Sequence, residues 1–142
     1  MAVDPAFAPM AELLPQPTEA SEPFWNGLRE GELRMQHCAA CGNYQHPAET
    51  FCYFCGSTDV NWETVAGGGA IYSFIVVHQP YHVAFRDRLP YVVATVQLDE
   101  GPRMLGAIFD VDAADISIGM RVKPRIEAVS DEGAALFFEL EA

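Results

Sequence analysis

The sequence is poor in positive charge. Lysine occurs only at Lys123, and eight basic residues face twenty acidic ones, so the formal net charge is −12. Nucleic-acid affinity rests largely on neutralising phosphates with lysine and arginine. We therefore expect this acidic chain to bind no nucleic acid through its general surface.

Long apolar runs and known catalytic motifs are also lacking. No run approaches the roughly 20 apolar residues that cross a bilayer, and Met1–Pro17 lacks the basic and apolar regions of a secretory signal. We therefore expect a cytoplasmic protein without a membrane partner. The sequence contains no GxSxG elbow, phosphate-binding loop, GxGxxG or HExxH motif, so we expect no catalytic residues and no catalysis by the chain alone.

Composition divides the chain into three parts. Residues 1–20 contain four prolines and no periodic apolar pattern, which predicts a flexible tail or linker, although Phe7 could instead dock on the body or on a partner. Residues 21–66 combine a short helix with a cysteine-rich module. Residues 67–142 begin at a glycine-rich, flexible junction and have the pattern of a small β-barrel.

Regular elements are expected in the second and third parts. Ser21 is a suitable N-cap for a helix that ends near Glu32, with Phe24 and Leu28 on its apolar face. Turn residues then separate five short runs of strand-forming residues, and a helical turn is expected within 112–119. The predicted strands are Ala70–Gln79, Tyr91–Asp99, Arg103–Asp110, Arg121–Val129 and Ala134–Glu141.

Four cysteines form two CxxC pairs, and a glycine follows each pair. Cys38 and Cys41 make the first pair, and Cys52 and Cys55 make the second after a gap of ten residues. The two-residue spacing lets both sulfurs of a pair face one ion, and the glycine permits the positive φ of a tight turn. Four thiolates satisfy tetrahedral zinc and leave no open position for water. The sequence therefore predicts one structural Zn²⁺ ion, whose binding supplies the folding free energy of this small module.

Other uses of these cysteines are weaker interpretations. Two disulfides would be unusual in a cytosolic chain, and thioredoxin-like redox chemistry requires a CxxC pair beside a βαβ pattern. Rubredoxin binds iron with the same four ligands, so the ligands alone do not separate zinc from iron. His37 and His46 flank the cysteines, but four thiolates make neither of them necessary as a ligand.

An aromatic loop over residues 78–90 is the segment outside the cysteine module that most suggests binding. Long loops of barrels often hold binding residues, but an ordinary surface loop with packed aromatics explains the pattern equally well. Its candidate contact residues are His78, Tyr81, His82, Phe85 and Arg86.

One basic cluster is expected on this acidic chain. Arg121, Lys123 and Arg125 alternate with apolar residues, so they share one face of a strand. The cluster either contacts an anion such as a nucleotide phosphate or is a solvated strand face. The solvated face is the favoured interpretation.

A combination of short motifs covers most of the chain after residue 20. The segments are Phe24–Leu33, the two CxxCG pairs with Pro47 between them, Gly69–Phe74, Pro90–Ala94, Leu98–Arg103 and Ile118–Val122. Together they resemble the domain-of-unknown-function 35 family, although each segment alone is a weak signal.

The resemblance implies a mostly β fold with an N-terminal helix, a rubredoxin-like zinc ribbon and a five-stranded OB-fold barrel. It also implies a non-catalytic accessory subunit or domain that stabilises a thiolase-like acyl-CoA enzyme, an aldolase or thiolase of steroid side-chain or other lipid degradation. Such a chain is a required component of an aldolase or acyltransferase complex, shares acyl-CoA with its partner, and works beside a MaoC-like hydratase. The alternative function is an OB-fold module that binds single-stranded nucleic acid.

Aromatic and apolar side chains are the expected contacts with the partner enzyme. Aromatic side chains bury a large area with little loss of conformational entropy, so they commonly anchor interfaces. In addition to the aromatic loop, the candidates are Phe24, Trp25, Leu28, Tyr53 and Phe54.

Overall fold

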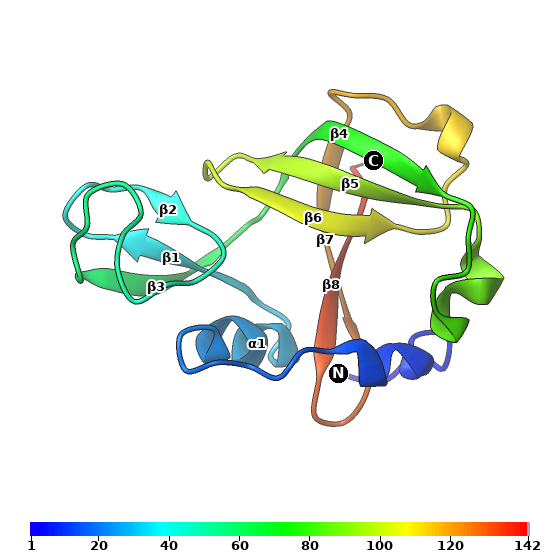
Figure 1. The fold of residues 1–142 in the computed structure, drawn as a ribbon, viewed down its shortest axis with the longest axis horizontal. Helices are drawn as coiled ribbons and strands as arrows, with labels where there is room; N and C mark the ends of the chain where they lie inside the picture. The colour runs from blue at the N-terminus through cyan, green and yellow to red at the C-terminus, as the bar shows by residue number, and fades with distance from the viewer. Residues whose placement is uncertain (142) are drawn as a thin grey trace.

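The computed structural model describes residues 1–141 and contains a small sheet beside a closed barrel (Figure 1). The small sheet is antiparallel, with the strand order β2-β1-β3. Its strands are β1 (Leu33–Cys38), β2 (Tyr44–Gln45) and β3 (Val60–Val65). The central strand therefore ends at the first predicted metal ligand.

Five strands form the barrel in the order β4-β5-β6-β8-β7, and pairing of β7 with β4 closes it. The contact between β6 and β8 is parallel, whereas the other neighbours are antiparallel. The predicted OB-fold is therefore confirmed, and each predicted strand boundary lies within two residues of the observed one. The strands are β4 (Gly69–Val77), β5 (Tyr91–Leu98), β6 (Arg103–Ile108), β7 (Arg121–Ala128) and β8 (Ala134–Leu140).

One hydrophobic core joins the helix, the ribbon sheet and the barrel. The helix α1 (Glu22–Arg29) starts after the predicted N-cap, Ser21, and packs against both β1 and β8. Leu28 of α1 and Met35 of β1 lie in the same buried cluster as Phe138 of the barrel. An eight-residue helix is marginal alone, so this packing accounts for its stability.

The N-terminal segment packs on the barrel, and the prediction of a flexible tail is corrected. The short 3₁₀ helix η1 (Ala8–Leu13) follows Phe7, whose side chain is only 1% exposed. The guanidinium carbons of Arg88 and Arg125 lie 4.3 Å and 5.1 Å from the centroid of the Phe7 ring. Burial of this ring and its cation–π contacts hold the segment in place.

The junction between ribbon and barrel is closely packed and is not the flexible hinge expected from its glycines. Gly67 has a φ of +73°, and a Cβ atom there would lie 2.4 Å from the Leu33 side chain and 2.7 Å from that of Pro124. Only glycine therefore allows the ribbon to approach the barrel this closely.

Two short 3₁₀ helices complete the elements. They are η2 (Val83–Arg88) in the aromatic loop and η3 (Ala113–Asp115) between β6 and β7, where a helical turn was expected. Among the described residues, no helix has the length and apolar character needed to cross a membrane.

Candidate metal centre

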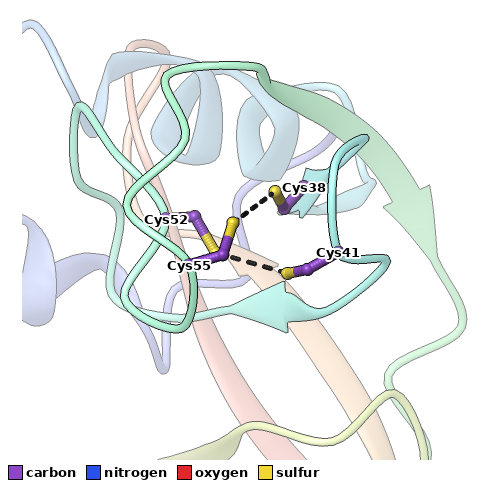
Figure 2. A group of neighbouring side chains, drawn as sticks. All are labelled: Cys38, Cys41, Cys52 and Cys55. Atoms are coloured by element: carbon purple, nitrogen blue, oxygen red, sulfur yellow. Dashed lines mark hydrogen bonds between the residues drawn. The ribbon is translucent and has the colours of Figure 1, made fainter.

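The four predicted cysteines converge from two knuckles (Figure 2). Their sulfur atoms all lie within 4.8 Å of one another. The Sγ atoms of Cys38 and Cys55 are 3.7 Å apart, and those of Cys41 and Cys52 are 3.6 Å apart. Four sulfurs held tetrahedrally at about 2.3 Å from one ion are about 3.8 Å apart. The arrangement therefore fits one tetrahedral ion, whereas a disulfide requires about 2.05 Å between sulfurs.

The two knuckles repeat the same backbone hydrogen bonds. The Gly42 N–H donates to the Cys38 carbonyl at 2.8 Å, and the Gly56 N–H donates to the Cys52 carbonyl at 2.9 Å. Their φ angles are +80° and +78°, which only glycine adopts readily. This requirement explains why a glycine follows each CxxC pair.

Hydrogen bonds to the sulfurs favour thiolates at this site. The backbone and the side-chain amide of Asn43 donate to Cys41 and lower the pKa of its thiol to about 6. The backbone of Ser57 favours the Cys55 thiolate, but burial and the neighbouring thiols outweigh it and raise the pKa of Cys55 to about 12. Crowded thiols resist ionising together without a cation. A bound divalent ion such as zinc stabilises all four thiolates and closes the site to water.

Two buried glutamines hold the second knuckle in place, and nothing in the sequence singled them out. Gln36 and Gln45 are 5% and 3% exposed. The Gln45 Oε1 atom accepts the Tyr53 N–H at 2.9 Å, and its Nε2 group donates to the Phe51 carbonyl at 2.9 Å. One amide therefore fixes both chain neighbours of Cys52.

Gln36 extends this network to the rest of the loop between the knuckles. Its Oε1 atom accepts from the Gln45 Nε2 group at 2.8 Å and from the Glu49 N–H at 3.0 Å. Its Nε2 group donates to the Glu49 carbonyl at 2.8 Å. Since a buried amide without partners is costly, the two glutamines and the loop stabilise one another.

The predicted contact residues differ strongly in exposure. Tyr53 and Phe54, next to the second knuckle, are 43% and 63% exposed, and Tyr81 is 75% exposed. Phe24 and Leu28 are 8% and 0% exposed because they pack in the core of this chain. These two are therefore removed from the set of partner contacts, whereas the half-buried Trp25 stays in it as a prediction.

Two residues of the aromatic loop already have partners within the chain. The His82 Nδ1 atom accepts a hydrogen bond from the backbone of η2, and its Nε2 atom lies 3.0 Å from a carboxylate oxygen of Glu12. Phe85 packs in the cluster that includes Phe7. His78 and Arg86 are exposed, so their role as contacts stays a prediction.

Acidic neighbours pair with the basic cluster on β7. The Arg121 guanidinium donates to both carboxylate oxygens of Asp99, at 2.8 Å and 2.6 Å. Lys123 and Arg125 each lie within 4 Å of a carboxylate on the same sheet, Glu139 and Glu127 respectively. The cluster is thus neutralised locally, which disfavours a phosphate contact. Arg121 and Lys123 lie on a solvated face, whereas Arg125 is partly covered by Phe7.

Comparison with known proteins identifies both parts of the chain. Residues 25–61 match the family model described as ChsH2, rubredoxin-like zinc ribbon domain. Residues 62–127 match the model described as ChsH2, C-terminal OB-fold domain. A solved structure described as "Ltp2-ChsH2(DUF35) aldolase" superposes with a TM-score of 0.80 and 34% identity, covering 89% of this chain and 98% of that one.

Two curated relatives show the range of proteins that contain this module. The 3-oxo-4,17-pregnadiene-20-carboxyl-CoA hydratase alpha subunit of Mycobacterium tuberculosis is 36% identical over 81% of this chain and 36% of its own length. A DUF35 domain-containing scaffold protein of Methanocaldococcus jannaschii is 33% identical over 77% of this chain and 78% of its own. This chain spans about a third of the length of the hydratase alpha subunits that it matches. With its four-cysteine ribbon and OB-fold barrel, the chain belongs to the DUF35 family.

Proposed function

We propose that this chain is a non-catalytic, zinc-binding accessory subunit or domain that docks on and stabilises a thiolase-like acyl-CoA enzyme. The partner is an aldolase or a thiolase of steroid side-chain or other lipid degradation. The observation that carries the proposal is the similarity to the chain described with the Ltp2-ChsH2(DUF35) aldolase, which extends over 98% of that chain.

Exposed aromatic side chains beside a closed metal centre support this role. Phe51, Tyr53 and Phe54 surround Cys52 in the sequence and are 46%, 43% and 63% exposed. Four thiolates fill the coordination of the ion, so the centre offers rigidity and no position for substrate. Large side chains on a rigid support lose little entropy when a partner covers them, so they are suitable interface anchors.

The relatives also support two finer parts of the proposal. The hydratase alpha subunits that contain this module suggest a MaoC-like hydratase as a second partner. The same relatives act on a CoA thioester by name, so we include acyl-CoA as a ligand that this chain and its partner hold together.

The test is co-expression with a thiolase-like protein encoded near this chain, followed by affinity purification and metal analysis. Unmodified chain should co-purify stoichiometrically and contain one zinc ion. Phe54→Asp should weaken the complex at least about tenfold, as expected for a central anchor. Ile118→Asp, which alters a residue of similar exposure (68%) in the η3–β7 connection, is the matched control and should leave the affinity unchanged.

Two results would overturn the proposal. One is the absence of a complex with every thiolase-like protein tried. The other is turnover of an acyl-CoA thioester by the purified chain alone, which would show that the chain itself is catalytic.

A further inference from the structure

A groove lies where the N-terminal segment, α1, the ribbon loop and the barrel meet. Its volume is about 460 Å³. Leu13 of the N-terminal segment, Trp25 of α1, Pro47 of the ribbon loop and Leu136 of β8 form four of its sides. The aromatic anchors beside the second knuckle are not part of this groove, although Trp25, a predicted partner contact, lines it.

The groove is lined without a single charged side chain, although charged residues make up 20% of the chain. A charged ligand would lose its hydration there without gaining an ion pair. The uncharged, concave lining of the groove therefore favours a small apolar molecule. The volume of the groove lies within the range of about 300–1000 Å³ typical of small-molecule sites.

The lining has one side chain, His46, that can both donate and accept a further hydrogen bond. The His46 ring is half-buried, packs 5.3 Å from the Phe24 ring, and hydrogen-bonds to no residue within 1–141. Burial lowers the pKa of His46, so the imidazole is neutral at pH 7 and offers one donor and one acceptor. The Ser21 hydroxyl group in the lining already hydrogen-bonds to Thr18, and the indole of Trp25 can donate but not accept.

We propose that this groove binds the neutral, apolar part of a lipid-like molecule and that His46 hydrogen-bonds to a carbonyl or hydroxyl oxygen of that ligand. A long acyl chain and a fused-ring hydrocarbon share this chemistry. The groove is formed by residues of this chain alone. The inference rests on the acyl-CoA part of the proposed function, but it can be tested without the partner enzyme, so its failure is distinguishable from a failure of docking.

The chain contains a reporter for this site. Trp25 lines the groove and Trp62, the second tryptophan, lies outside it on β3. Zinc-loaded full-length chain carrying Trp62→Phe should be titrated with dodecanol and, separately, with progesterone. A saturable change in Trp25 fluorescence is expected with at least one of them, and the ligand that saturates identifies the linear or the fused-ring class. No saturable change with either ligand up to its solubility limit would overturn the proposal.

Substitutions in this tryptophan-reporter chain separate the groove from the general surface. Leu105, at the groove, is 72% exposed, and Ile75, on β4 outside the lining, is 63% exposed. Leu105→Glu should weaken binding at least about tenfold, since it places a charge at an apolar site. Ile75→Glu is the matched control and should change the affinity less than about twofold. Equal weakening by both substitutions would show non-specific surface binding and refute the site.

A further variant tests the polar contact. His46→Phe keeps an aromatic wall and removes the hydrogen bond, so binding of the oxygen-bearing ligand should weaken about three- to tenfold. Circular dichroism and zinc content should stay unchanged. Unaltered affinity in this variant would show that His46 does not contact the ligand.

Discussion

The Gln45 side chain, on β2 of the ribbon, holds the backbone on both sides of the metal ligand Cys52, and Gln45→Leu tests that role directly. Leucine is similar in size but cannot hydrogen-bond. The substitution leaves the Tyr53 N–H and the Phe51 carbonyl, on either side of Cys52, without their present partners. We expect the second knuckle to lose its fixed orientation while the barrel remains folded.

The magnitude follows from the two backbone groups that lose their partners. A buried polar group left unpaired costs about 1–3 kcal/mol. Both bonds are only partly buried, so water will replace some of each, and a total of about 2–3 kcal/mol is expected. Zinc binding is coupled to folding of the ribbon, so this cost lowers the zinc affinity by about 30- to 160-fold. Residues that orient metal ligands through hydrogen bonds typically contribute about 10- to 100-fold.

The assay is competition for zinc against a chromogenic chelator, using the full chain. Gln97→Leu is the matched control, because the Gln97 Nε2 group donates to the Gly101 carbonyl at 2.7 Å in the barrel, away from the metal centre. This control should bind zinc within about twofold of the unmodified chain. If Gln45→Leu also stays within about twofold, or if both variants weaken zinc binding equally, the reasoning is refuted.

Three further predictions concern the ribbon, the N-terminal segment and the barrel surface. Removal of zinc by a chelator should increase hydrogen exchange in residues 33–65 before it does so in the barrel. Simultaneous loss of amide protection in the ribbon and the barrel would contradict metal-dependent folding of the ribbon. Phe7→Ala should lower the free energy of unfolding by about 3 kcal/mol in thermal unfolding. The control Leu13→Ala, at a residue that is 40% exposed, should lower it by less than about 1 kcal/mol. Equal effects of the two substitutions would argue against a docked segment. Hydrogen bonds from Arg121 hold the pKa of Asp99 below its ordinary value of 3.8. In urea titrations the free energy of unfolding of the unmodified chain should exceed that of Asp99→Asn by its full amount above about pH 4, and this difference should vanish as the pH falls through the lowered pKa. A difference that persists below that pKa would refute the linkage.

Local patterns in the sequence were sufficient to predict the helix, the barrel strands and the four clustered cysteines. Alternation places Val122 inside the barrel and Arg121 outside, because successive side chains of a strand point to opposite faces. The CxxCG spacing places two sulfurs on one side of each knuckle, because its turn is set by a few neighbouring residues and the glycine φ. Such signals need no knowledge of the rest of the chain.

The docked N-terminal segment illustrates what local patterns missed. Its prolines and lack of periodicity are typical of disorder, and those features are real in the sequence. The surface that receives Phe7 is assembled from Arg88, Phe109 and Phe137, which are distant in the chain. The free energy of this contact exists only after the barrel has formed.

By itself the sequence determined the mostly β architecture, the five barrel strands and the four sulfur ligands, because each depends on periodicity or spacing over a few residues. Only the tertiary structure decided that Phe24 and Leu28 face the core, that Gln36 and Gln45 support the second knuckle, and that an uncharged groove opens beside His46. Burial and the pairing of buried polar groups depend on segments far apart in the chain, and their arrangement becomes known only when those segments are packed together.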